Sequence, residues 1–138
     1  LLEGWCCGSV PIANKYLFKN INTLENTYDK NTNWRKYYNS LLRNEYKSVF
    51  SLFDKKIYIK APSFKYVLEW RYAQEKRIAS KSNKKNYMNK VKLQEFIQHY
   101  EKLTKWMMLT MPNQADILIK IDSNQKIKKL LFKISKFH

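Results

Sequence analysis

Residues 93–121, which read LQEFIQHYEKLTKWMMLTMPNQADILIKI, contain the clearest structural pattern in the chain. Large apolar side chains recur with a 3.6-residue period from Leu93 to Met111, so we predict one amphipathic helix that ends at Pro112. The run ILIKI at 117–121 has the length and the β-branched composition of a short strand. A helix that leads into a strand is typical of layered α/β domains.

A second strand and helix precede this stretch. The run KIYIKA at 56–61 predicts a short buried strand that stops at Pro62, and Ser63 is suited to cap the helix that follows. The side chains expected on the inward face of that helix are Phe64, Val67, Leu68 and Tyr72. The polar segment 79–89 contains no large aliphatic residue before Met88, so we expect it to be mobile.

The N-terminal part is less regular. LLEGW at 1–5 resembles the end of a buried strand that runs into a glycine turn, and residues 6–33 show no sustained period beyond one short helix. A further helix is predicted from Trp34, capped by Thr32 or Asn33. Its expected inward residues recur in steps of three and four: Trp34, Tyr38, Leu41, Leu42, Val49, Phe50 and Phe53. The tail from 127 fits either a helix or a returning strand after the turn at 122–124.

Strands separated by helices predict an α/β layered domain with a mainly parallel sheet. Chemistry gathers at the carboxyl ends of the strands in such a sheet. Glu3, Pro62 with Ser63, and Asp122 occupy these ends and are therefore the first candidates for a site.

Length and composition limit the classes of protein to which the chain can belong. A chain of 138 residues with 44% hydrophobic and 15% aromatic side chains suffices for one compact domain and is unlike a disordered or collagen-like sequence. Every apolar run is interrupted well before the roughly 20 residues that a membrane span needs, and the first residues do not resemble a secretion signal. Because Cys6 and Cys7 are adjacent, loop-closing disulfides are excluded and we expect a reduced, cytoplasmic chain.

The net charge of +16 allows more than one interpretation. A basic chain attracts polyanions such as nucleic acid, nucleotide phosphates or an anionic membrane surface. However, only four of the 27 basic residues are Arg, the side chain preferred for recognising bases and phosphates. The many Lys, Asn, Ile and Tyr residues are equally consistent with a drift in nucleotide composition that has nothing to do with binding.

Seven strings of sequence occur in an order that resembles one enzyme family. They are LLEGWCCG at 1–8, INTLE at 21–25, WRKYYN at 34–39, KAPSF at 60–64, VLEWRYAQE at 67–75, FIQHYEKLTKWM at 96–107 and MPNQADILIKID at 111–122. In this order they resemble the C-terminal part of bacterial D-glycerate 3-kinases and their kinase-like relatives. These belong to the P-loop group that includes uridine kinase and pantothenate kinase.

The resemblance implies a parallel-sheet, P-loop kinase-like fold and transfer of the terminal phosphoryl group of ATP to a hydroxyl of a small acid, with D-glycerate as the expected acceptor. ATP and Mg²⁺ are the implied cofactors, and nucleic acid and membrane are not expected as partners. Glu3 is the expected catalytic and metal-binding residue, which either holds Mg²⁺ through water or orients the acceptor hydroxyl. The alternative is that its carboxylate only caps the turn at Gly4.

Other residues of the matching strings supply the remaining site. Arg71, as a catalytic and nucleotide-binding residue, and Arg77, as a nucleotide-binding residue, belong to a lid-like segment at about 71–92 that closes over the phosphates. Because they are six residues apart, we expect only one of them, Arg71, to be central. The expected substrate-binding residues are Trp5, Trp34, Arg35 and Tyr38, with the Arg35 fork suited to a carboxylate. The alternatives are that both lid arginines lie on a solvated helix surface, that Trp34 is core and that Arg35 is exposed.

The chain departs from the family in two places. No Gly-x-x-x-x-Gly-Lys-[Ser/Thr] loop occurs in residues 1–138, so we expect an N-terminally truncated or separately encoded C-terminal portion of one kinase domain, inactive without the half that carries the loop. By family topology the missing strand lies between the strand ending at Glu3 and the strand at 56–61, so their edges should be unpaired. MNK at 88–90 should be a weak start for the long helix. A basic nucleic-acid-binding module and an inactive regulatory remnant stay as alternative functions.

Overall fold

The computed structural model describes residues 1–81 and 88–133. Residues 82–87, which belong to the segment predicted to be mobile, lie outside the described residues. Three strands form one mixed sheet in the order β1 (Ile57–Lys60), β2 (Ile117–Ile121), β3 (Ile127–Phe132). The first pair is parallel and the second is antiparallel. The prediction of a mainly parallel sheet is therefore confirmed for the pair β1 and β2 and is wrong for β3, which is antiparallel to β2. The short turn after β2 allows only an antiparallel return, because a parallel connection needs a dozen or more residues.

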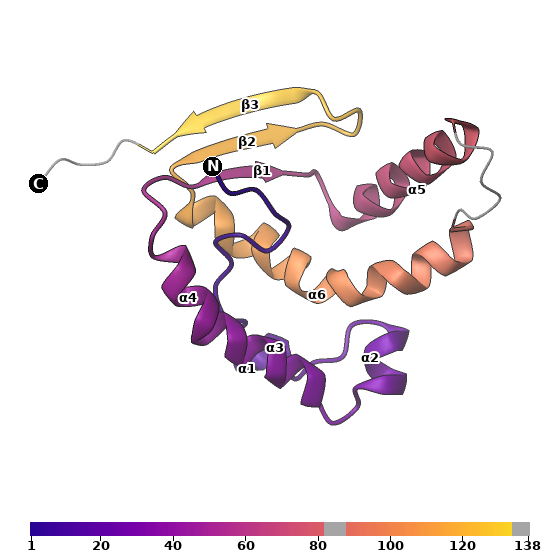
Figure 1. The fold of residues 1–138 in the computed structure, drawn as a ribbon, viewed down its shortest axis with the longest axis horizontal. Coiled ribbons are helices and arrows are strands. Elements are labelled where there is room, and N and C mark those ends of the chain that lie inside the picture. Colours follow the sequence, from indigo (N-terminus) through magenta and orange to yellow (C-terminus); the bar gives the residue numbers. More distant parts are fainter. Residues whose placement is uncertain (82–87, 134–138) are drawn as a thin grey trace, which may run out of the picture.

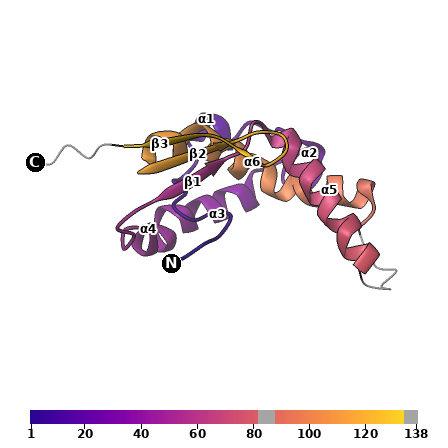
Figure 2. The ribbon, with the colours of Figure 1, turned by 90° about the horizontal axis from the view of Figure 1, so that it is seen from above.

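Six helices accompany the sheet within the described residues: α1 (Asn14–Leu17), α2 (Thr23–Tyr28), α3 (Asn33–Arg43), α4 (Glu45–Phe50), α5 (Phe64–Lys81) and α6 (Lys90–Gln114). Figure 1 shows α6 running from the far end of α5 back to the sheet, with α1 to α4 on the side of α6 away from β3. Figures 1 and 2 both show α5 beside the first half of α6, as an arm that extends beyond the strands. The polypeptide is thus a mixed α/β unit.

The long helix follows its predicted period. The apolar side chains buried along α6 are Leu93, Ile97, Leu103, Met107 and Met111. The helix ends at Gln114, beyond Pro112, because proline in the last turn removes only one backbone donor and the amide of Ala115 still reaches the carbonyl of Met111 at 2.9 Å. The principal core is formed where α6 meets the N-terminal helices: Ile12, Leu17, Leu42, Phe50, Leu103, Met107 and Met111.

The single helix expected from Trp34 to Phe53 is two helices. The backbone breaks at Asn44, which has φ −106° and ψ −84°. Thr32 stands at the cap position but has a left-handed φ of 62° and makes no capping bond; the Asp29 carboxylate accepts the first amides of α3 instead. The predicted inward residues Trp34 and Val49 are 59% and 45% exposed.

The strand expected at the N-terminus is absent from the described structure. Residues 1–4 have no strand conformation, and Leu1 and Leu2 are exposed. A buried strand needs a neighbour that pairs with its backbone groups, and within the described residues none lies beside this segment. The expected unpaired edge is present on β1, which among the described strands is hydrogen-bonded only to β2.

Candidate functional site

The carboxyl ends of β1 and β2 meet at one edge of the sheet. Lys60 is paired in register with Lys120, and the chain leaves both strands in the same direction because they are parallel. A depression of about 400 Å³ lies at this edge, lined among others by Lys60, Pro62, Tyr66, Lys120, Asp122 and Lys128. Pro62 and Asp122 are thus brought together as the sequence predicts, whereas Glu3 does not line this depression.

The depression is basic. Its lining includes three lysines and one carboxylate, that of Asp122. Asp122 Oδ1 already accepts hydrogen bonds from the backbone amides of Asn124 at 2.8 Å and Lys126 at 2.9 Å. Asp122 therefore shapes the β2–β3 turn, while the lysine ammonium groups offer donors to an anion. An ammonium acts as a flexible point charge, so this edge suits a phosphate or carboxylate group rather than the planar recognition of a base.

The two predicted phosphate-binding arginines line a second depression, of about 620 Å³. Arg71 and Arg77 flank Gln74 in steps of three residues along α5, and these steps place both arginines on one side of the helix. Both arginines thus border one depression, and which of them is central to a bound phosphate stays a prediction. Arg71 is held by Glu75 and by Gln74, each at 2.7 Å, whereas Arg77 is exposed.

A hydrogen bond joins the regions of the two depressions. The Trp70 indole N–H donates to the carbonyl of Ser123 at 2.8 Å, which ties α5 to the β2–β3 turn. Ser123 lines the lysine depression and Gln125 lines the arginine depression. The lysine ends of the strands and the arginines of α5 thus lie on either side of this turn, and we call them together the basic surface around the β2–β3 turn.

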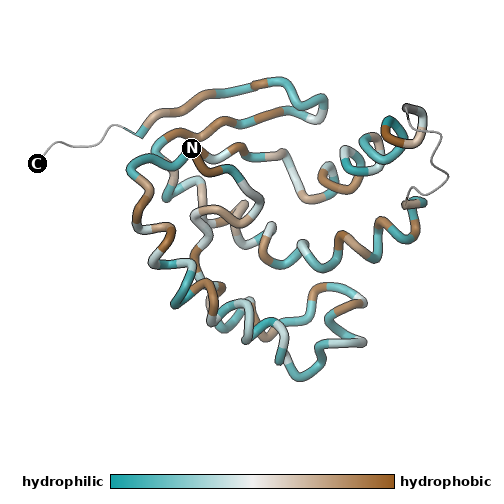
Figure 3. The backbone as a smooth tube through the Cα atoms, in the orientation of Figure 1, coloured by the Kyte–Doolittle hydropathy of each residue, from teal (hydrophilic) through white to brown (hydrophobic). Residues whose placement is uncertain are grey.

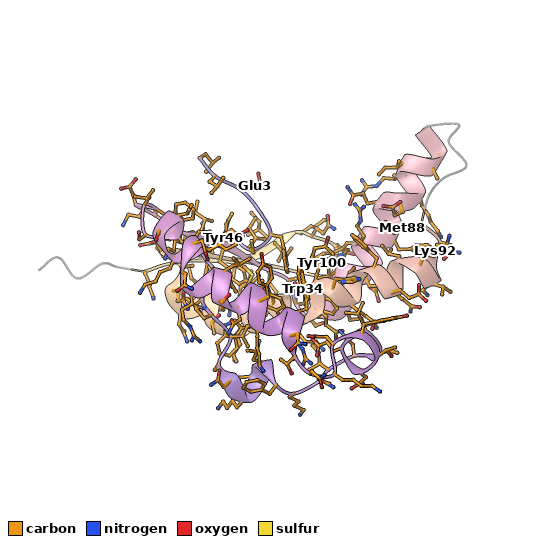
Figure 4. All side chains as sticks on the ribbon, turned by 60° about the horizontal axis from the view of Figure 1, so that its bottom comes forward. Glu3, Trp34, Tyr46, Met88, Lys92 and Tyr100 are labelled. Carbon is orange, nitrogen blue, oxygen red and sulfur yellow. The ribbon has the colours of Figure 1, made fainter. Side chains whose placement is uncertain are left out.

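Residues 88–92, at the C-terminal end of the expected lid segment, are held by hydrogen bonds. Asn89 caps α6, since its Oδ1 accepts the amide of Lys92 at 2.9 Å. The amide of Met88 donates to Glu75 Oε2 at 3.4 Å, across from α5. The prediction of a weak helix start at 88–90 is therefore wrong, because asparagine is itself a strong N-cap. Figure 4 shows Met88 and Lys92 at the start of α6, beside α5.

Glu3 lies apart from both depressions. It is exposed, on the N-terminal segment that projects from the body in Figure 4. Trp5, expected to bind substrate, instead anchors this segment to α6: its indole N–H donates to Thr104 Oγ1 at 2.8 Å, and its ring meets Tyr100 edge-on at 4.9 Å. With its donor used and its ring packed, Trp5 fixes the direction in which Glu3 leaves the domain.

The substrate residues expected on α3 do not form a pocket with Glu3. Trp34 lies on the surface against Tyr37, with ring centroids 5.5 Å apart. Tyr38 packs against the principal core, and burial raises the pKa of its hydroxyl. Tyr38 therefore serves packing more than recognition.

Arg35 is neither exposed nor free to bind a carboxylate of a substrate. It is 2% exposed, and its Nε donates to Asp29 Oδ2 at 2.7 Å. Its terminal nitrogens donate to Glu25 Oε2 at 3.3 Å and to the carbonyls of Leu17 and Asp29. Four hydrogen bonds occupy the guanidinium, so the substrate-binding expectation for Arg35 is wrong and its role is structural.

Three other charged residues complete this buried cluster. The Lys102 ammonium, from α6, lies 3.2 Å from Glu25 Oε2 and donates to the carbonyls of Tyr16 and Lys19. Burial lowers the pKa of Lys102, although the charge of Glu25 acts in the opposite direction. Burial opposes ionisation of Asp29 as well, but hydrogen bonds from Arg35 and from the backbone of α3 keep the pKa of Asp29 below its usual value. The cluster joins α2, α3 and α6.

One signal for this cluster is present in the sequence. NTLE at 22–25 has the spacing of a capping box, in which a cap residue and an acid three positions later satisfy the free amides of a helix start. Asn22 Oδ1 accepts the amide of Glu25, and Glu25 Oε2 accepts the amide of Ile21, both at 3.0 Å. That pattern places Glu25 at the start of α2, but local spacing gives no indication that Arg35 and Lys102 lie against it.

No group of three or more His, Cys, Asp or Glu side chains in residues 1–81 and 88–133 is placed to hold a metal ion. Over the same residues, no helix has both the length and the apolar character to cross a bilayer.

Two solved structures share the fold. D-glycerate 3-kinase from Cryptococcus neoformans var. grubii serotype A superimposes with a TM-score of 0.68 and 19% identity, over 94% of this chain and 48% of that chain. The YGR205w protein superimposes with a TM-score of 0.61 and 22% identity, over 96% of this chain and 47% of that chain. The chain therefore spans about half the length of each. Neither the comparison with family models nor that with curated proteins gives a match.

Proposed function

We propose that this chain is one half of an ATP-dependent small-molecule kinase that phosphorylates a hydroxyl of a small hydroxy acid, with D-glycerate as the first acceptor to test. The observation that carries the proposal is the superposition of nearly the whole chain on about half of a D-glycerate 3-kinase. The ordered strings of sequence support it independently. The chain alone is inactive in this proposal, because no Gly-rich loop ending in Gly-Lys-Ser or Gly-Lys-Thr is present in its sequence.

The basic surface around the β2–β3 turn suits the polyphosphate of a nucleotide. Lys60, Lys120 and Lys128 provide ammonium donors, and Arg71 and Arg77 line the adjoining depression. Fixed cations stabilise the charge that spreads over the phosphoryl oxygens during transfer. Arg71 is already oriented by Glu75, so it reaches toward a ligand at little further entropic cost. These side chains hold and orient the anion, while the loop-bearing half supplies the amide cradle.

Mg²⁺ needs few protein ligands when a nucleotide is bound. It is usually held by one or two carboxylates together with substrate phosphates and water. The resemblance assigns that role to Glu3, which is exposed and lies apart from both depressions in this chain, so the role requires the N-terminal segment to be repositioned when the loop-bearing half is present. When bound, ATP supplies the phosphoryl group and Mg²⁺ neutralises its oxygens. Glu3 is proposed either to hold the ion through water or to orient the acceptor hydroxyl, and Trp5 fixes the base of the segment that carries it.

The test joins this chain to a loop-bearing N-terminal half and follows transfer of labelled γ-phosphate from ATP to D-glycerate. We expect transfer only when both halves are present, and a loss of about 100-fold or more in kcat for Glu3→Gln. Glu45→Gln, at an exposed carboxylate of α4, is the matched control and should leave kcat unchanged. Unchanged turnover in Glu3→Gln removes Glu3 from the mechanism; a complex that binds ATP and transfers no phosphate favours an inactive remnant.

Nucleic-acid binding is the second candidate, and the net charge of +16 is the observation that favours it. Binding through phosphate contacts weakens steeply as salt is raised, because counterions are released. A steep decrease of affinity for DNA or RNA with salt, together with no phosphate transfer after the two halves are joined, would select this function over the kinase.

A further inference from the structure

The surface formed by α1, α2 and α3 carries exposed positive charge and no exposed negative charge. Residues 13–44 contain two acids, Glu25 and Asp29, and both are buried against Arg35. The exposed charged side chains of this range are therefore all cationic: Lys15, Lys19, Lys30, Lys36 and Arg43. Because the acids are buried, this surface is more basic than the local sequence suggests.

The same surface exposes aromatic rings. Within residues 13–44, every large hydrophobic side chain that is exposed is aromatic: Tyr16, Phe18, Tyr28, Trp34 and Tyr37. Tyr28, the last residue of α2, is 84% exposed. Figure 3 shows hydrophilic colour from the end of α2 into α3, so the rings in this stretch stand among polar residues and not within an apolar patch.

Four of these cationic and aromatic side chains lie together. Tyr28, Lys30 and Trp34 line one depression of about 400 Å³ between the end of α2 and the start of α3. The Trp34 ring contacts that of Tyr37, one turn further along α3, with centroids 5.5 Å apart. We call Tyr28, Lys30, Trp34 and Tyr37 the aromatic face.

The surroundings of the aromatic face add to its positive charge. The Lys36 ammonium, also on α3, lies 5.6 Å from the centroid of the Phe18 ring. Glu101 of α6, which accepts a hydrogen bond from Asn22 at 3.0 Å, is paired with Lys105 at 2.6 Å, so its charge is already offset. Figure 1 shows α6 between α3 and the β2–β3 turn, and the aromatic face is therefore separate from the basic surface around that turn.

Exposed rings beside cations suit an unpaired strand of nucleic acid. In a single strand the bases are free to stack on side-chain rings while the phosphates contact nearby cations. An acidic protein fits less well, because lysine is depleted at protein interfaces and four of the five exposed cations in residues 13–44 are lysines. A bilayer surface fits less well too, because a helix that lies in it presents a continuous apolar side.

We infer that the aromatic face binds single-stranded nucleic acid without sequence preference. Bases stack on Tyr28 and Trp34, and phosphates contact the ammonium groups of Lys30 and Lys36. The inference gives the second candidate function a site and a class of ligand. It does not rest on the proposed kinase function, since the residues that it uses lie apart from the basic surface around the β2–β3 turn.

The experiment measures binding of fluorescein-labelled oligonucleotides of about 12 nucleotides to the full chain by fluorescence anisotropy. Oligothymidylate and oligouridylate are the two single strands, and a duplex of the same length is compared with them. We expect at least one single strand to bind ten or more times as tightly as the duplex, and the preference between the two identifies DNA or RNA as the source. Duplex binding that is as tight as single-strand binding would overturn the inference.

Competition separates bases from charge alone. Polyglutamate and vesicles of phosphatidylcholine with phosphatidylserine offer negative charge without bases, so neither should displace the bound strand at an equal concentration of charge. Displacement by polyglutamate would assign the surface to an acidic protein, and displacement by the vesicles would assign it to a membrane. Either result would overturn the inference.

Variants locate the binding. Tyr28→Ala and Trp34→Ala should each weaken binding of the strand about tenfold through the loss of stacking. Phe132→Ala is the matched control, since Phe132 is an exposed aromatic residue of β3. Trp34→Phe retains a ring and should bind within about threefold of the original chain, but without the quenching of Trp34 fluorescence that a stacked base causes. Circular dichroism checks that each variant is folded.

The possible failures are distinguishable. If both alanine variants bind the strand as tightly as the original chain, the net charge is responsible, so the aromatic face falls and the second candidate function stands. If the chain binds no strand and the joined halves transfer phosphate, this inference falls and the kinase function stands. If Trp34→Ala loses binding and the joined halves transfer no phosphate, this inference stands and the kinase function falls.

Discussion

The region around Arg35 and the sheet differ in whether their side chains and backbone groups are partnered within the chain. In the first, two acids and two bases are buried at 2–8% exposure, and each finds its partners within the chain. In the second, apolar side chains are left exposed and one strand edge lacks a partner among the described residues. The buried charges of the helical side are therefore satisfied within the chain, whereas the sheet leaves one apolar face exposed and, among the described strands, one edge unpaired.

The largest expected effect is at the centre of the complete region. Arg35→Ala removes the partner of two buried carboxylates, and an uncompensated buried charge costs about 3–5 kcal/mol. Urea unfolding followed by circular dichroism measures this loss. Arg43→Ala, on the same helix but exposed, should change the free energy of unfolding by less than about 0.5 kcal/mol. Similar values for both variants would show that the cluster does not hold the helices together.

The acid sensitivity of the same region should be next in size. The pKa of Asp29 is lower in the folded chain than its unfolded value of about 3.9. Its ionised form therefore stabilises the fold at pH values above about 3.9, and this contribution is lost as pH falls through the folded pKa. Asp29→Asn should cost about 1.5–3 kcal/mol at pH 7 and should flatten the dependence of stability on pH below about 4.

Urea midpoints measured from pH 7 to pH 2 test the prediction for Asp29. Asp54→Asn, at an exposed carboxylate, is the control and should follow the wild-type curve. A wild-type chain whose stability below pH 4 falls no more than that of Asp29→Asn would contradict the role given to this carboxylate.

A smaller effect is expected where the arm is capped. Asn89→Ala removes the side chain that accepts the amide of Lys92, and loss of an N-cap costs about 1 kcal/mol. Asn89→Asp should retain most of the stability, because aspartate accepts the same bond. Thermal unfolding of the three proteins measures the difference, and equal stability of the alanine and aspartate variants would contradict the cap.

The smallest effect is expected on the exposed face of the sheet, at Ile59 of β1. Ile59→Thr should change the free energy of unfolding by less than about 0.5 kcal/mol, because the side chain is already 59% exposed. Leu42→Ala, at a residue that is 3% exposed, should cost about 2–5 kcal/mol by comparison. A loss of 2 kcal/mol or more for Ile59→Thr would mean that this face is packed within the chain itself.

Much of the fold could be predicted from local patterns. The 3.6-residue period from Leu93 to Met111 predicts α6, and the runs at 56–61 and 117–121 predict the parallel pair of strands. For the tail, the returning strand is the alternative that the structure confirms. The helix, the two runs and the returning strand depend on neighbours in sequence or on a short turn, so local patterns suffice for them. The pairing of β1 with β2 is long-range, and it follows from the rule that strands separated by a helix pair in parallel.

The failures share a physical cause. A strand at 1–5 needs a neighbour, and the pattern of apolar residues cannot show whether that neighbour is present. Arg35 has a fork suited to a substrate carboxylate, but Asp29 and Glu25 of the chain occupy it, and Lys102, from a distant part of the sequence, shares Glu25 with it. Both the absent strand at 1–5 and the structural role of Arg35 depend on contacts between residues that are far apart in sequence. Local patterns in a single sequence do not reveal such contacts. The site predictions for Glu3, Arg71 and Arg77 are untested and stay proposals.

Amide hydrogen exchange of the isolated chain tests the central contrast most directly. We predict slow exchange for the amides of α6 from Lys102 to Met111, and fast exchange for the β1 amides that point away from β2. If every amide of β1 exchanges as slowly as α6, the edge of β1 is already protected and the contrast between the helical side and the sheet is wrong.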